Sequence, residues 1–129
     1  MRLGRITRLT GAGVSGCRFY ALQGSPLHAS EHLPGPKQPV LEIIARSYPS
    51  ELSAHNAVAT DARSGHSAQR ASFGKIEGAC FQTNFYPKDH GQDWACAANK
   101  QRTEVVIHSV DTTGTFSTAS ILRSVLRRV

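Results

Sequence analysis

The chain has 129 residues, and its 15 Lys and Arg side chains against 9 Asp and Glu give a formal net charge of +6. This length suits one small domain, and no apolar run approaches the roughly 18 residues that a membrane-spanning helix needs. Three cysteines cannot all pair with one another, which argues against a disulfide framework. We therefore expect a small single domain of α+β class. It would have a few short strands and an amphipathic C-terminal helix, after a mostly disordered leader and a Pro-rich linker.

The positive charge lies mainly at the two ends of the chain. Residues 1–30 contain four arginines and no acidic residue, and the last seven residues add three more arginines. The segment between them, residues 31–122, is nearly neutral. A nucleic-acid-binding domain usually spreads its positive charge over a folded face, so nucleic acid is a possible partner that this distribution does not favour.

The N-terminal segment, residues 1–20, is predicted to be a mitochondrial transit peptide. It is rich in Arg and lacks acidic residues, as such leaders are. On a helical wheel Arg5 and Arg8 share one side and Leu3 and Ile6 the other, which would suit the import machinery. A mitochondrial location follows, in the matrix or at the inner membrane. If the segment is only a basic tail, the protein is expected in the cytoplasm.

A short motif marks a possible cleavage point at the end of this segment. The sequence Arg18-Phe19-Tyr20-Ala21 resembles the motif cut by the mitochondrial processing peptidase. That motif has Arg, then any residue, then an aromatic residue or Leu before the cut, and Ala or Ser after it. The resemblance implies cleavage after Tyr20 and a mature chain that begins at Ala21.

The middle of the chain is predicted to begin with a linker. Residues 21–38 are rich in Pro and Gly, and the sequence Pro-Gly-Pro within them excludes regular helix. The folded domain is expected to span 39–129. Apolar residues at helical spacing predict a helix over 39–48, and an Ala-rich segment predicts a second helix over 51–62. Residues 61–75 show no periodicity and are predicted to be loop.

The C-terminal half gives clearer patterns. Alternating apolar residues predict a strand over 79–86, a turn follows over 87–92, and consecutive β-branched residues predict a strand over 104–110. Ser117 is a plausible N-cap for a final amphipathic helix. This helix is the predicted interaction face for a protein partner. Its apolar stripe is Ile121, Leu122, Val125 and Leu126, and its basic residues are Arg123, Arg127 and Arg128.

The turn before this helix is a candidate phosphate site, because a strand, a polar turn and a helix N-terminus can cradle an anion. The candidate residues are Asp111, Thr112, Thr113, Gly114, Thr115 and Ser117. The segment resembles the phosphorylated-aspartate motif of P-type ATPases, with Thr112 in place of the usual Lys. It also distantly resembles the phosphate loop of folate-polyglutamate ligases, again without the Lys. Ordinary turn and capping chemistry explains the same residues.

No metal, cofactor or catalytic constellation is predicted. Cys80, His90, Cys96 and His108 have irregular spacing and no short pair of the kind that structural zinc sites use. Cys80 and Cys96 are expected to be buried thiols or a redox-formed pair. No Gly-x-Ser-x-Gly nucleophile elbow occurs in the chain.

The predicted function is that of a small mitochondrial accessory or assembly protein. It would dock without catalysis to a larger complex, such as a respiratory complex or the organelle ribosome. Two alternatives remain open. One is a phosphate- or nucleotide-binding enzyme fragment that uses the turn before the final helix. The other is a truncated or weakly selected reading frame without a stable function.

Overall fold

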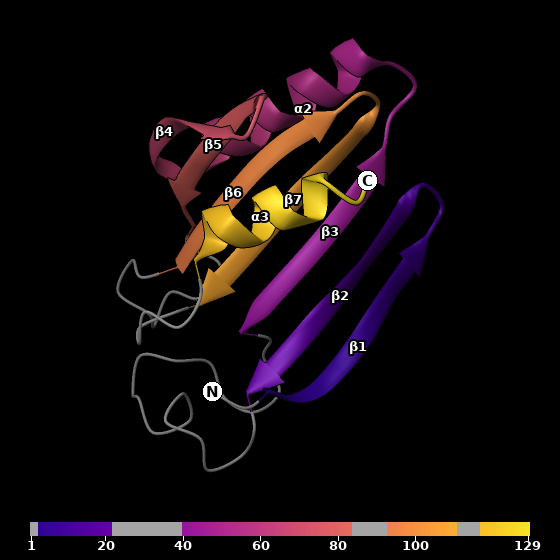
Figure 1. The fold of residues 1–129 in the computed structure, drawn as a ribbon, viewed down its shortest axis with the longest axis vertical. Helices are drawn as coiled ribbons and strands as arrows, with labels where there is room; N and C mark the ends of the chain where they lie inside the picture. Colours follow the sequence, from indigo (N-terminus) through magenta and orange to yellow (C-terminus); the bar gives the residue numbers. More distant parts are fainter. Residues whose placement is uncertain (1–2, 22–39, 84–92, 111–116) are drawn as a thin grey trace.

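The computed structural model describes residues 3–21, 40–83, 93–110 and 117–129. These described residues form one seven-stranded antiparallel sheet with two helices, in the strand order β1-β2-β3-β7-β6-β5-β4 (Figure 1). The strands are β1 Leu3–Gly11, β2 Val14–Ala21, β3 Leu41–Ser47, β4 His66–Phe73, β5 Ile76–Gln82, β6 Asp93–Lys100 and β7 Thr103–Val110. The helices are α2 Glu51–Ser64 and α3 Thr118–Leu126.

The fold is dominated by its sheet, and the predicted α+β class with a few short strands was wrong. The largest difference lies at the N-terminus, where the expected disordered leader forms the hairpin of β1 and β2. Gly13 closes its turn with φ of +69°, in a region that glycine adopts at little cost. β2 then pairs with β3, so this hairpin extends the main sheet (Figure 1).

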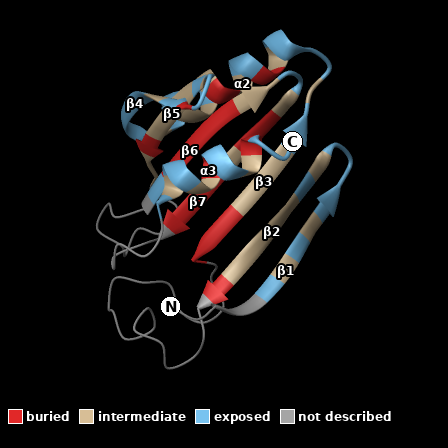
Figure 2. Cartoon of the chain, viewed as in Figure 1, coloured by how far each residue is buried: buried red, intermediate tan, exposed pale blue. Residues whose placement is uncertain are grey.

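The pairing register divides the side chains between two faces of the sheet, one facing each helix. On the α3 face, the main core joins strand residues such as Ile107 and Val105 to Leu122 and Leu126 of α3. On the α2 face, a smaller core surrounds Val58 of α2; its strand residues are Phe81, Ala95 and Ala97. Figure 2 shows buried residues concentrated on β6, β7 and the first part of β3. The sheet is therefore covered best at its centre.

The helix predicted over 39–48 is strand β3 in the structure. Its apolar residues match helical spacing by coincidence, because both faces of β3 carry apolar side chains. Ile43 faces α3 and Ile44 faces α2, in register with Ile107 and Val106 of β7. β-Branched residues favour such a strand, since their side chains are restricted in a helix.

The loop predicted over 61–75 is also wrong, because it contains the end of α2 and the whole of β4. β4 is an edge strand, and most of its side chains are exposed and polar, so it lacks the usual alternation. Strand β6, which lies between β5 and β7, was not predicted either. Its Ala residues are weak strand formers, but small side chains suit a strand that packs beneath a helix on each face.

Other predictions are confirmed. The segment predicted as a helix over 51–62 is α2, where the Ser50 side chain accepts a hydrogen bond from the Ser53 amide at 3.0 Å. The strand predicted over 104–110 is β7, and Ser117 is the N-cap of α3. The strand predicted over 79–86 corresponds to β5 as far as Gln82. The turn predicted over 87–92 and almost all of the linker predicted over 21–38 lie outside the described residues.

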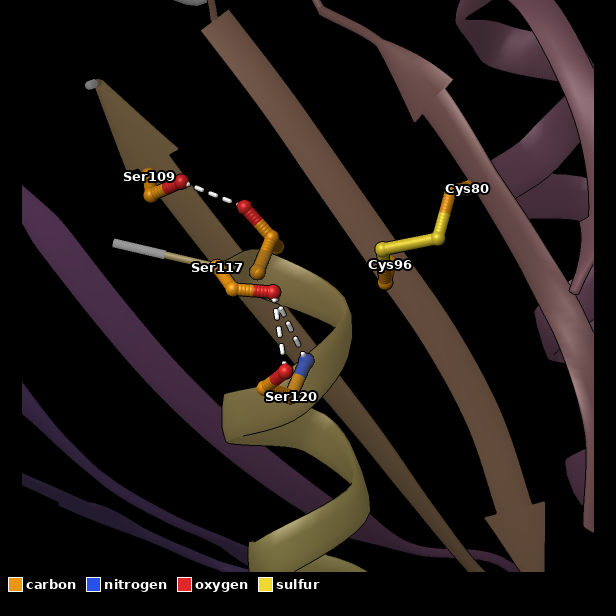
Figure 3. Close-up of a disulfide and its surroundings, with 6 residues drawn as sticks. Cys80, Cys96, Ser109, Ser117 and Ser120 are labelled. Atoms are coloured by element: carbon orange, nitrogen blue, oxygen red, sulfur yellow. Dashed lines mark hydrogen bonds between the residues drawn. A yellow bond between two sulfur atoms is a disulfide. The ribbon is translucent and has the colours of Figure 1, made fainter. Parts of the chain in front are cut away.

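A disulfide joins β5 and β6 on the α3 face of the sheet. Cys80 and Cys96 face each other in the register, with Cα atoms 4.1 Å apart (Figure 3). Close by, the Ser117 side chain caps α3, and Ser109 of β7 hydrogen-bonds the Thr118 side chain at 2.6 Å. The disulfide and these hydroxyl contacts fix neighbouring parts of the same face.

Removing the disulfide should lower stability, because an unfolded chain without it has more conformations available. The cysteines are 16 residues apart, and closing a loop of that length stabilises by about 3 kcal/mol in the chain-entropy model. We expect the double variant Cys80→Ala/Cys96→Ala to unfold at lower urea concentration. Cys17→Ala, which removes the free cysteine of the described residues, is the control and should unfold close to the wild type.

A glycine in β2 tests whether the N-terminal hairpin belongs to the folded sheet. A Cβ at Gly16 would lie 3.1 Å from Cα of Ile44 and would clash with the Ile43 carbonyl. Gly16→Ala should therefore cost about 1–3 kcal/mol by overpacking. Gly11→Ala, in the same hairpin, meets nothing within 4 Å. Equal urea midpoints for the two variants would show that the hairpin does not pair with β3.

Candidate functional site

A cavity of about 310 Å³ lies on the α2 face of the sheet. Its apolar wall consists of Ile44, Phe81, Ala95 and Val106. Its polar wall consists of Arg18, Glu42, Arg46, Asp61, Ser64, Thr83 and His108. Arg46 and Ser64 are exposed, so they flank the opening, whereas Glu42 and His108 are buried. The cavity combines an apolar interior with a few converging polar groups, which is the usual form of a small-molecule site.

The sheet register creates the polar wall. Arg18 on β2 lies opposite Glu42 on β3, and Glu42 lies opposite His108 on β7. Directly opposed side chains on neighbouring strands are about 5 Å apart at Cβ. The next residue in this row is Ala95 on β6, and its small side chain lets the His108 ring reach Thr83. Residues far apart in the sequence thus form one polar row across the sheet.

Hydrogen bonds connect members of this row, and burial and a nearby charge determine the protonation state of His108. The Arg18 Nε donates to the Glu42 Oε2 at 2.8 Å, and the His108 Nε2 lies 3.0 Å from the Thr83 hydroxyl. Burial lowers the pKa of His108, although the nearby Glu42 opposes this shift. His108 is therefore neutral at pH 7. Because Glu42 favours a proton on Nδ1, we assign Nε2 as the acceptor of the Thr83 hydroxyl.

A second ionisable cluster lies beside the cavity, between α2 and the sheet. Glu104 of β7 is fully buried, and its Oε1 accepts a hydrogen bond from the Tyr48 hydroxyl at 3.1 Å. Burial raises the pKa of Glu104 to about 8, and the carboxyl of Asp61 on α2 adds to the rise. Tyr48 and Arg46 oppose this rise. Glu104 is therefore mostly protonated at neutral pH.

The described residues hold neither a metal centre nor a spanning helix. They contain no group of three or more His, Cys, Asp or Glu side chains placed to hold a metal ion. Within the same part of the chain, no helix is long and apolar enough to cross a membrane. The polar groups that line the cavity are a neutral imidazole, two carboxyl groups, two guanidinium groups and two hydroxyls.

The structure places the predicted site residues in several different settings. Residues Asp111, Thr112, Thr113, Gly114 and Thr115 of the candidate phosphate turn lie outside the described residues, and Ser117 is the cap of α3. Of the candidate zinc ligands, Cys80 and Cys96 form the disulfide on the α3 face and His108 lies on the opposite face. His90 lies outside the described residues. The structure thus does not bring the described members of this set together.

The predicted interaction face and cleavage motif are partly used inside the domain. Leu122 and Leu126 are buried in the core, whereas Ile121 and Val125 are half-buried at its edge. Arg123, Arg127 and Arg128 are exposed. In the cleavage motif, Arg18 belongs to the polar row and Tyr20 is buried in β2, which ends at Ala21.

The polar row cannot be assembled from the sequence pattern, although its members carry a recognisable signal. Glu42 and His108 are charged or polar residues inside otherwise apolar strand segments. Such a residue facing a core needs a partner, so each one points to a buried polar site. The partner itself depends on the strand order, which the sequence pattern alone does not specify.

Comparisons with known proteins assign no family to the chain. No protein-family model matches the chain, and no curated protein matches it either.

The buried Glu104 predicts how stability depends on pH. Its pKa is higher in the folded protein than in the unfolded chain, so the folded state binds the proton more tightly. Protonated Glu104 therefore stabilises the folded state at acidic pH, and this contribution is lost as the pH rises toward about 8. Between pH 6.5 and 8, urea titrations should show a loss on the order of 1 kcal/mol per pH unit.

Glu104→Gln should flatten this slope, because the amide keeps the neutral form at every pH. Glu77→Gln, which changes an exposed carboxyl on the same face, is the matched control and should keep the wild-type slope. A wild-type stability that rises between pH 6.5 and 8 would contradict the assignment of a neutral, buried Glu104.

Proposed function

We propose that the protein binds a small, mostly apolar molecule that carries a hydroxyl group, in the cavity between α2 and the sheet. The observation that carries this proposal is the lining of the cavity, where Glu42 and His108 lie beside a mostly apolar interior. The His108 Nδ1 and the Glu42 Oε1 are 3.9 Å apart across the cavity wall. That distance is too long for a direct hydrogen bond, and a ligand hydroxyl placed next to both atoms would be within reach of each.

A hydroxyl suits this position because it can both accept and donate. Its oxygen would accept the proton of the His108 Nδ1, and its own proton would point to the Glu42 Oε1. The Arg18 guanidinium already neutralises Glu42 from the other side. A charged head group is therefore not required, and the ligand class is a small alcohol or phenol.

The size and lining of the cavity support an apolar body for this ligand. An apolar cavity of about 150 Å³ can hold a benzene ring, and this one has about twice that volume. Phe81, Ile44 and Val106 provide the contact surface. An aromatic ring with one polar substituent therefore fits the available space.

The wider biological setting stays a prediction. A mitochondrial location, a docking role in a larger complex and a phosphate site in the turn before α3 all rest on the sequence patterns. Ligand binding in the cavity is compatible with an accessory role and does not require catalysis. The N-terminal hairpin matters for the predicted mitochondrial import, because cleavage after Tyr20 would remove Arg18 from the polar row.

A matched pair of ligands tests the proposal. We expect 4-methylphenol to bind in the cavity and toluene, which lacks the hydroxyl, to bind more weakly by at least about threefold to tenfold, the effect of a single hydrogen bond. Nuclear magnetic resonance titrations that follow the methyl groups of Ile44, Ala95 and Val106 would locate and quantify both. Equal affinities would exclude the hydroxyl bridge, and no shifts with either ligand would exclude the cavity as a site.

Two variants test the contact with the ligand hydroxyl and the use of the cavity separately. His108→Phe keeps an aromatic ring but removes both ring nitrogens, so it should reduce the preference for 4-methylphenol while toluene still binds. Ala95→Leu fills the cavity and should weaken both ligands. Circular dichroism and urea titration would show that each variant is folded, and Arg70→Met on the same face but outside the cavity serves as a surface control.

A further inference from the structure

The opposite face of the sheet is incompletely covered by the described residues. α3 crosses β6 and β7, while the hairpin of β1 and β2 extends beyond it (Figure 1). On this face Ile6, Cys17 and Phe19 of the hairpin follow one another in register with Leu41 and Ile43 of β3. Ile6 is 58% exposed, and Cys17 and Phe19 are only half-buried. An apolar surface therefore continues outward from the core.

A recess on α3 borders this surface. It has a volume of about 310 Å³ and is lined by Ser120, Ile121, Ser124, Val125 and Arg128. Ile121 and Val125 pack against the same core cluster as Phe19 and Ile43. The helix flank and the uncovered strands thus form one elongated surface, which we name the α3 groove.

The formal charges of the described side chains are sorted by face. Those on the α3 face are all positive: Arg8, Lys100, Arg123, Arg127 and Arg128. Those on the α2 face are mixed: Arg18, Arg46, Arg63 and Arg70 with Glu42, Glu51, Asp61, Glu77 and Glu104. The α3 groove is therefore apolar along its floor and has only positive side chains around it.

We propose that the α3 groove binds an amphipathic, acidic helix of a partner protein. An apolar face of such a helix would cover Phe19, Ile43 and Val125, as in other helix-in-groove complexes. Its acidic residues would lie near Arg8 and Arg128 at the two borders. The charge complementarity would speed association and select acidic partners over basic ones.

Two features of the groove favour a protein helix over other polyanions. Nucleic acid is bound mainly through phosphate contacts and stacked bases, whereas the floor here is largely aliphatic. A membrane surface is usually met by apolar groups that insert into it, whereas Ile121 and Val125 line a recess. An elongated, hollow apolar surface is instead complementary to the convex face of a helix.

The probe for this proposal is a fluorescein-labelled synthetic peptide of about 15 residues, long enough for four helical turns. It carries Leu along one helical face and Glu on the other, and its control has Lys at every Glu position. Fluorescence anisotropy with the full-length protein should show binding of the Glu peptide, weakening with added salt. The Lys peptide should not bind, and equal binding of both peptides would overturn the proposal.

Charge-reversal variants locate the binding surface. Arg8→Glu/Arg128→Glu changes two exposed residues at the borders of the groove and should weaken the Glu peptide by about tenfold, or about 1.4 kcal/mol. Arg63→Glu/Arg70→Glu makes the same change in net charge on the α2 face and should alter the affinity by less than about twofold. An equal loss in both double variants would mean that only net charge matters and would overturn the proposal.

Cys17 supplies an independent readout, because it is a free cysteine in the floor of the groove. Saturating Glu peptide should slow its reaction with N-ethylmaleimide, with Cys17→Ser as the labelling control. Unchanged labelling in the presence of bound peptide would place the peptide elsewhere. Binding to phosphatidylserine vesicles or to single-stranded RNA, with no binding of the Glu peptide, would likewise reject a protein helix as the occupant.

Discussion

The pairing of β3 with β7 is the constraint on which the rest of the structure depends. It joins the N-terminal strands β1, β2 and β3 to the strands β4 to β7, which would otherwise form two separate small sheets. Its register sets Ile43 against Ile107 on one face and Glu42 against His108 on the other. A slip of one residue would exchange these faces, placing a carboxylate in the main core and an isoleucine in the polar row. One set of backbone hydrogen bonds thus determines both the core and the candidate site.

The parts of the fold that could be predicted are those whose signal is local. α3 has a capping serine and an apolar stripe at helical spacing, and β7 has consecutive β-branched residues. β3 was predicted as a helix because it is buried on both faces, so its apolar residues do not alternate. β6 gave no signal because its small residues are selected by packing between two helices, which is a property of the assembled sheet. The N-terminal segment was predicted from composition, and composition does not distinguish a basic leader from a basic hairpin.

The candidate site shows the same division between local and long-range information. The sequence places Arg18 in a possible cleavage motif, and the irregular spacing around His108 argues against a zinc site, so nothing in the sequence connects the two residues. Their connection passes through Glu42 on the strand between them, and therefore requires the strand order. Thr83 joins the group only because Ala95 is too small to block the imidazole. A polar residue within an apolar strand could be recognised from the sequence, whereas its partner could not.

The position of β2 inside the sheet also constrains when a peptidase could cut the chain relative to its folding. β2 is hydrogen-bonded to β1 on one side and to β3 on the other, and Tyr20 is buried within it. A protease acts on a folded protein only after the target segment opens. A peptidase that cuts after Tyr20 would therefore have to reach the chain before the sheet forms. Maturation and folding would compete for the same segment, and a molecule that folds first would keep its N-terminus.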